Sequence, residues 1–206
     1  DVVIMNPPFS DIEKIAKINP EMLEKIRKNR ILRKITGSRV NLWGYFLALS
    51  DLVLKEKGRM SAVVPISFAK GAATQEIRNY MLSNYSTRFI IKPSNEDKAF
   101  SQNASLKDIL YIADKKKSEK NDKTAIVIFK SSVKNMELKR IAEIVTELKR
   151  IYTNNQIEHL ESNEDYSIKI ISTKELSKNS SNLMPFFVAP EITDFIKKIR
   201  KLAGEK

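Results

Sequence analysis

The sequence predicts an α/β protein whose parallel or mixed sheet lies between layers of helices. Short continuous apolar runs rich in β-branched residues are typical of strands buried on both faces. Longer segments carry apolar residues at helical spacing, and the two kinds of segment alternate over residues 1–113. With 206 residues, of which 42% are hydrophobic and 30% charged, the chain should fold around one main core with at most a small appendage.

Six segments are predicted as strands because each is short, apolar and bounded by turn-forming residues. The first ends at Pro7 and Pro8, which cannot donate hydrogen bonds to a neighbouring strand. Pro65 similarly ends the second. The predicted strands are residues 2–5, 59–66, 88–92, 106–113, 124–129 and 166–171.

The helices are predicted from apolar spacing and from their boundary residues. Ser10 fits an N-cap with Glu13 as its capping-box partner, Asn19-Pro20 ends that first helix, and Gly58 is placed to stop another. In the segment 41–57 the apolar residues Leu42, Phe46, Leu49 and Val53 recur at helical spacing. The predicted helices are 10–18, 21–39, 41–57, 72–84, 133–152 and 191–202, and the lysine-rich stretch 115–123 is predicted as an exposed turn or linker.

The net charge indicates a polyanionic partner. Thirty-seven basic and 25 acidic residues give +12, with a pI near 9.7, and each phosphate that a protein neutralises releases counterions. Between Lys25 and Arg39 there are seven basic residues and no acidic one. This basic arm, residues 25–39, either contacts a DNA backbone, which we favour, or is a solvated helix face.

The composition also excludes several kinds of chemistry. Without cysteine there are no disulfides, thiolate zinc sites or cysteine nucleophiles, and a single histidine leaves little room for a histidine-based centre. His159 has three glutamates nearby in the sequence, but we expect a surface histidine and no metal site. No apolar run approaches the roughly 20 residues of a membrane-spanning helix, so we expect a cytoplasmic protein with no membrane partner.

The tetrapeptide Asn6-Pro7-Pro8-Phe9 lies where a site is expected, because ligands of open α/β sheets bind at the carboxyl ends of strands. The Asn6 side-chain carbonyl and the Pro7 backbone carbonyl are two acceptors suited to the two N–H groups of a planar amine, such as that of adenine. They would stabilise the positive charge that grows as this nitrogen attacks an electrophile. Phe9 offers a flat face on which a base stacks, typically worth about 1–3 kcal/mol.

This tetrapeptide resembles the Asn/Asp-Pro-Pro-Tyr/Phe motif of S-adenosylmethionine-dependent amino-methyltransferases. The resemblance is greatest to the N6-adenine DNA methyltransferases of restriction-modification systems, of type I or type II G-like organisation. Residues 41–47, 57–65 and 99–101 resemble further segments of that family in the same order and spacing. The resemblance therefore covers residues 1 to about 117.

The resemblance implies a Rossmann-like sheet with strand order 3-2-1-4-5-7-6 and methyl transfer from S-adenosyl-L-methionine to a flipped adenine in double-stranded DNA. It implies that Asn6, Pro7, Pro8 and Phe9 form the catalytic turn, in which Asn6 and Pro7 bind the amine. Phe9 and Phe100 would hold the base, and Pro8 and Phe46 would touch the cofactor. An aromatic residue on an amphipathic helix is as readily a core residue, so this alternative stays open for Phe46.

The sequence departs from the family in one respect. The family's glycine-rich cofactor turn and its ribose-binding acidic residue precede the catalytic strand, whereas the five glycines here form no Gly-x-Gly turn. We therefore expect residues 1–117 to be the C-terminal half of a catalytic domain, with strands 4-5-7-6 only, and to be inactive alone. Residues 118–206 would be an α+β extension leading to a target-recognition region or specificity subunit. The free edge of strand 2–5 should pair with another molecule or lie under the C-terminal segment.

Two other functions remain open. Relatives with Asn-Pro-Pro-Tyr use the same two acceptors on a protein glutamine or an RNA amine, although Phe9, the basic arm and Phe100 favour DNA adenine. Alternatively, the chain is a non-catalytic nucleic-acid-binding subunit that has kept the scaffold.

Overall fold

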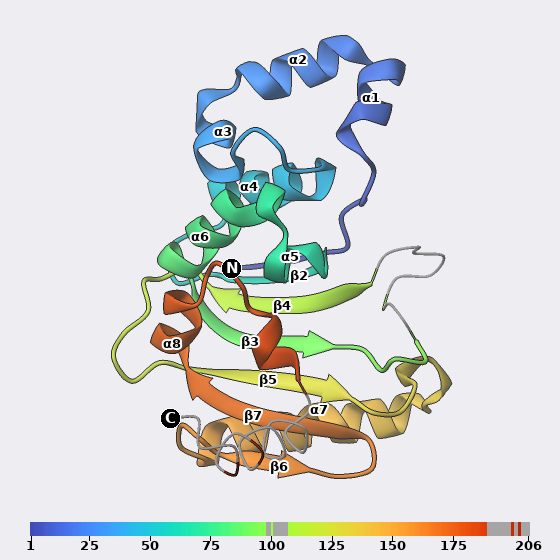
Figure 1. The fold of residues 1–206 in the computed structure, drawn as a ribbon, viewed down its shortest axis with the longest axis vertical. Coiled ribbons are helices and arrows are strands. Elements are labelled where there is room, and N and C mark those ends of the chain that lie inside the picture. The colour runs from blue at the N-terminus through green and yellow to red at the C-terminus, as the bar shows by residue number, and fades with distance from the viewer. Residues whose placement is uncertain (98–99, 101–106, 189–198, 200–201, 203–206) are drawn as a thin grey trace.

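A seven-stranded mixed sheet forms the centre of the protein in the computed structural model, which describes residues 1–97, 100, 107–188, 199 and 202 (Figure 1). All six predicted strands are present, and the short strand β6 was not predicted. The strands are β1 (Val2–Met5), β2 (Arg59–Pro65), β3 (Ser86–Lys92), β4 (Asp108–Asp114), β5 (Lys123–Phe129), β6 (Leu160–Ser162) and β7 (Tyr166–Ser172).

The strand order is β1-β2-β4-β3-β5-β7-β6. β1 and β2 are parallel, and β4 runs antiparallel between β2 and β3. The first four strands thus have the 4-5-7-6 order that the resemblance implies, which confirms the predicted fold class. β5 continues the sheet by pairing parallel to β3, and β7 and β6 complete it.

Helices surround the sheet, and α1, α2 and α3 extend beyond its β1 edge (Figure 1). Among the described residues, three short 3-10 turns accompany them, at Ala72–Thr74, Val133–Asn135 and Met184–Phe187. The helices are α1 (Ile12–Ile18), α2 (Pro20–Lys28), α3 (Arg30–Thr36), α4 (Leu42–Val53), α5 (Ser67–Lys70), α6 (Gln75–Asn84), α7 (Leu138–Asn154) and α8 (Thr173–Lys178).

Several predicted helix boundaries are wrong. The predicted helices 72–84 and 133–152 each begin with a 3-10 turn, and their α-helices start only at Gln75 and Leu138. The expected helix 21–39 is two helices, because the Asn29 side-chain oxygen accepts hydrogen bonds from the backbone N–H groups of Ile31 and Leu32 and begins α3. Helix α1 begins at Ile12, so Asp11 and not Ser10 precedes it. Helix α4 ends at Val53 rather than at residue 57; the left-handed turn residue is Lys57, with φ of 66°, and not Gly58. The predicted helix 191–202 lies almost entirely outside the described residues.

Two apolar clusters lie on opposite faces of the sheet. On β5, for example, Ile126 belongs to the cluster that includes residues of α3, α4 and α6, whereas its neighbours Ala125 and Val127 belong to the cluster beneath α7. The same alternation occurs on β3, where Ile90 and Phe89 contact different clusters. This alternation is the two-residue period of a strand buried on both faces, and it confirms the predicted layers.

At the β1 end, several apolar side chains are exposed. Val2 and Ile4 are 64% and 80% exposed, and α4 presents Phe46, Leu49, Leu52 and Val53 at 40–75% exposure. β1 pairs with β2 alone within the described part of the chain. Residues 166–188 do not cover this edge, because α8 contacts β3 and β5 and the turn Met184–Phe187 contacts β5. Most of the remaining C-terminal residues lie outside the described part of the chain, so both the cover by the C-terminal segment and the pairing with another molecule stay predictions.

Candidate active site

The Asn6-Pro7-Pro8-Phe9 turn leaves the sheet directly after β1. Asn6 and Pro8 are exposed, Pro7 is buried, and Phe9 is half-buried against the apolar cluster of α3, α4 and α6. One part of Phe9 is therefore fixed by the core and another part faces solvent. The sequence places the turn correctly at a carboxyl strand end.

Helix α4 is attached to both ends of this turn. The Leu42 backbone N–H donates to the Ser10 carbonyl at 3.4 Å, and the Ser50 hydroxyl donates to the Met5 sulfur at 3.4 Å. Phe46 lies midway between these two contacts, on the part of α4 that runs alongside the turn. Because Phe46 is 40% exposed, its interpretation as a core residue is wrong within this chain.

Phe100 reaches the same edge of the sheet through Asp108. The antiparallel strand β4 begins where β2 ends, since Asp108 pairs with Pro65. Asp108 is 1% exposed, and its side-chain oxygen accepts a 2.6 Å hydrogen bond from the Phe100 backbone N–H. The candidate base-binding residue is thus anchored at the edge that carries Asn6. Ala99 and Ser101, its neighbours in the motif, lie outside the described residues.

Two lysines lie at the same edge of the sheet. Lys92, at the end of β3, is half-buried and donates to the Asn95 side-chain oxygen at 3.2 Å. Lys107, directly before β4, is exposed, and both lysines line a small hollow with Asp108 and Ile66. Burial, followed by the nearby charge of Lys107, lowers the pKa of Lys92.

Sequence reasoning missed Asp108, Lys92 and Lys107. Their signal is the pairing of β4: an antiparallel strand brings its first residues to the edge where parallel strands end. That orientation follows from the topology and not from any local pattern.

The basic arm is at the surface on α2, α3 and the loop after them. All seven of its basic residues are exposed, and one of them, Lys28, pairs with Glu24 at 2.6 Å. Its charge is therefore available to solvent and to a polyanion.

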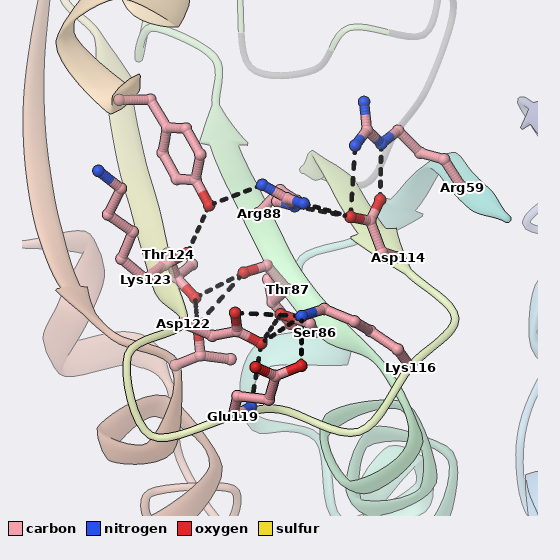
Figure 2. A network of polar contacts seen from close by, with 12 residues as sticks. Arg59, Ser86, Thr87, Arg88, Asp114, Lys116, Glu119, Asp122, Lys123 and Thr124 are labelled. Atoms are coloured by element: carbon pink, nitrogen blue, oxygen red, sulfur yellow. Dashed lines mark hydrogen bonds and ion pairs between the residues drawn. The ribbon is translucent and has the colours of Figure 1, made fainter. Parts of the chain in front are cut away.

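The opposite edge of the sheet holds a denser polar network (Figure 2). Asp114, at the end of β4, accepts hydrogen bonds from Arg59 and Arg88, both at 2.7 Å. Asp122 likewise pairs with Lys116 at 3.2 Å. Arg59, Arg88 and Lys116 are thus paired with carboxylates, whereas Lys123 at the same edge donates to the backbone carbonyls of Thr153 and Asn155.

His159 lies 3.3 Å from Glu161, and nowhere in the part of the chain that the structure describes do three metal-ligating side chains gather. None of the helices among the described residues is long and apolar enough to span a membrane.

Comparison of sequences gives two matches. Residues 1–100 match the family model of the Eco57I restriction-modification methylases. The type II methyltransferase M.BsuBI of Bacillus subtilis is 27% identical over 105 residues, which are 51% of this chain and 19% of that protein.

Solved structures share the fold across most of the chain. A chain from a type I restriction-modification system, studied for its complex assembly and conformational transition, aligns with a TM-score of 0.60 at 17% identity, over 99% of this chain and 43% of that one. The type IIG restriction endonuclease BpuSI gives 0.59 at 16% identity, over 91% and 21%. The type I methyltransferase subunit of Streptococcus thermophilus gives 0.54 at 19% identity, over 89% and 36%.

This chain spans less than half of each of these proteins. The sequence match covers the Asn6 turn, α4 and β2, and the shared fold extends through β7. The resemblance identified from the motifs is thereby confirmed: residues 1–100 match the family model of the Eco57I restriction-modification methylases.

Proposed function

We propose that this chain is part of a site-specific DNA adenine-N6 methyltransferase that uses S-adenosyl-L-methionine. The observation that carries the proposal is the position of the Asn6-Pro7-Pro8-Phe9 turn at the carboxyl end of β1, in a chain related to restriction-modification methylases. The anchoring of Phe100 at the same edge supports it.

In the proposed reaction, Asn6 and Pro7 accept hydrogen bonds from the two N–H groups of a flipped adenine. The lone pair of the adenine nitrogen forms the new bond to the methyl carbon, and the electron pair of the broken carbon–sulfur bond stays on sulfur. The nitrogen then loses one proton to solvent. The two oxygen acceptors stabilise the positive charge on this nitrogen, so no titratable base is needed in the chain.

The base itself is held by aromatic residues in this proposal. Phe9 stacks on the flipped adenine through its exposed part, and Phe100 closes the pocket from the β4 side. Stacking of about 1–3 kcal/mol per base offsets part of the energy needed to extrude a nucleotide from a duplex.

This chain would supply only part of the binding site for the cofactor. S-adenosyl-L-methionine supplies the methyl group when bound, and Pro8 and Phe46, both exposed, would contact its adenosine side. The five glycines form no Gly-x-Gly turn, so the methionine end would be held by residues outside this chain. The chain alone should then be inactive, and the exposed apolar side chains of β1 and α4 support its completion by another part of the enzyme.

DNA is the proposed macromolecular partner. The basic arm would contact the backbone beside the flipped base, and residues 118–206 would lead to a target-recognition domain or a specificity subunit. An enzyme of this kind acts on chromosomal DNA in the bacterial cytoplasm.

A substrate comparison tests the proposal. The complete methyltransferase would be incubated with methyl-labelled cofactor and, separately, with duplex DNA, RNA and a glutamine-bearing protein of release-factor type. We expect label on N6 of adenine in DNA alone. Labelling of protein glutamine or RNA would assign the chain to the other amino-methyltransferases, and DNA binding without any transfer would make it a non-catalytic subunit.

A further inference from the structure

We propose that Lys92 and Lys107 form a binding site for a DNA backbone phosphate, placed beside the pocket for the flipped base. This inference rests on the proposed function and adds to it a site separate from the basic arm. It follows from three features of the edge formed by β3 and β4.

The first feature is the environment of Lys92. Its ammonium group is half-buried, and its partner in the described chain is the neutral Asn95 oxygen at 3.2 Å. Burying a charge without a counter-charge is unfavourable. An anion that arrives from outside would remove this penalty.

The second feature is the proximity of a like charge. Lys107 lines the same hollow as Lys92 and lies near enough to lower its pKa, an effect added to that of burial. Within the described residues neither lysine is within ion-pair distance of a carboxylate. The nearest acid in the hollow, Asp108, is buried and holds the Phe100 N–H.

The contrast with the opposite edge strengthens this point. There Arg59 and Arg88 share Asp114, and Lys116 pairs with Asp122 (Figure 2). These three cations are paired with carboxylates, and Lys123 at the same edge donates to two backbone carbonyls. Lys92 has only the neutral Asn95 oxygen as a partner in the described chain, and Lys107 has no carboxylate partner there.

The third feature is location. β4 and β3 are the second and third strands from β1, which at a strand spacing of about 4.8 Å places the lysines about 10–15 Å along the edge from the Asn6 turn. This span corresponds to about three or four base steps of one DNA strand. A duplex whose adenine enters the pocket would therefore bring a flanking phosphate to the lysines.

The salt dependence of DNA binding tests the site. Affinity of the complete methyltransferase for a fluorescein-labelled duplex with its adenine target would be measured by fluorescence anisotropy between about 50 and 200 mM salt. We expect Lys92→Gln and Lys107→Gln each to reduce the slope of log K against log salt by about 0.9, and the double variant by about twice that. Lys92→Arg keeps the positive charge and should therefore keep the slope. This variant shows whether a changed side chain at the half-buried position by itself disturbs DNA binding.

The matched control is Lys117→Gln with Lys120→Gln, two exposed lysines in the loop after β4 at the opposite edge, which should leave the slope unchanged. A slope unchanged in Lys92→Gln and Lys107→Gln would overturn the phosphate site while the enzyme still methylates adenine. Failure of the unmodified enzyme to bind DNA would overturn the site and the proposed function together. The variant Asn6→Ala should abolish methyl transfer but keep the salt dependence of DNA binding, so it separates binding from chemistry.

Discussion

The buried carboxylate of Asp108 holds the backbone of Phe100 through a 2.6 Å hydrogen bond. Asp108 is the first residue of β4 and pairs with Pro65 at the end of β2, so a rigid strand end fixes a residue proposed to hold the target base. Asp108 is thus a candidate positioning residue that acts through Phe100.

Replacing Asp108 should weaken use of the DNA substrate. In Asp108→Ala, kcat/KM for DNA should fall by about tenfold to a hundredfold, because a hydrogen bond to a charged group is worth about 1.5–3 kcal/mol. Asp108→Asn keeps an oxygen acceptor and should retain most of the activity. Steady-state methylation of a short duplex measures both.

A double-mutant cycle separates positioning from general damage to the fold. If Asp108 acts through Phe100, Asp108→Ala should add little to the loss already caused by Phe100→Ala. Losses that simply add would contradict the positioning role.

The exposed apolar face of α4 should tolerate charge in this chain but not in the complete enzyme. Leu49 and Val53 are 47% and 75% exposed, so Leu49→Lys with Val53→Lys should change the free energy of unfolding of the 206-residue chain by no more than about 0.5 kcal/mol each. The same two substitutions should lower the methylation activity of the complete methyltransferase, because this face of α4 would be covered there. Urea unfolding and methylation assays measure the two effects.

Leu47, on the buried face of α4, is the control, since Leu47→Ala should destabilise the chain by about 2–5 kcal/mol. Full activity of the complete enzyme carrying Leu49→Lys and Val53→Lys would contradict the prediction, because it would show that this face of α4 stays exposed to solvent.

Helix α4 shows how much of the fold the sequence predicts. Its existence follows from apolar spacing, but Leu42–Val53 is apolar almost all round, so the spacing of Phe46, Leu49 and Val53 does not reveal which face meets the core. Trp43, Leu47 and other side chains are buried instead. Periodicity identifies a face only when the opposite face is polar.

The same limit applies to the candidate site. The Asn6 turn is predictable because its residues are contiguous and follow a strand. Asp108, Lys92 and Lys107 come together only through the antiparallel pairing of β4, which depends on long-range contacts. The split at Asn29 was missed for a local reason, since a side chain that caps one helix also ends the preceding one.

Asp114 should make the stability of the chain sensitive to acid. Burial alone would raise the pKa of this carboxyl, but hydrogen bonds from Arg59 and Arg88 hold it below its ordinary value of 3.8. A lowered pKa in the folded state stabilises the protein above pH 3.8 and loses that contribution as the pH falls through the folded-state pKa. Asp114→Asn should remove about 1.5–3 kcal/mol of stability at neutral pH and flatten the acid limb of the profile.

Urea unfolding between neutral and acidic pH measures this effect. Glu119→Gln, at an exposed carboxylate, is the control and should preserve the acid limb. An acid limb in Asp114→Asn as steep as in the unmodified chain would rule out Asp114 as its source.

Arg78 should be needed to hold the C-terminal segment to α6. Its side chain is fully buried and donates to the carbonyls of Phe68, Gly71, Ser180 and Ser181. Arg78→Met would leave these acceptors without their donor, so the free energy of unfolding should fall by about 3 kcal/mol or more. Arg150→Met, at an exposed position of α7, should be nearly neutral in the same denaturation measurement; equal stabilities of the two variants would contradict this role.

The most direct measurement is methyl transfer by Asn6→Ala in the complete enzyme on its own DNA site. Removing the amide oxygen should lower kcat by at least about a hundredfold, the usual effect of losing one preorganised group at a charge that develops in the transition state, while the salt dependence of DNA binding is unchanged. Methylation of adenine at the unmodified rate by Asn6→Ala would contradict the assignment of this turn as the amine-binding centre.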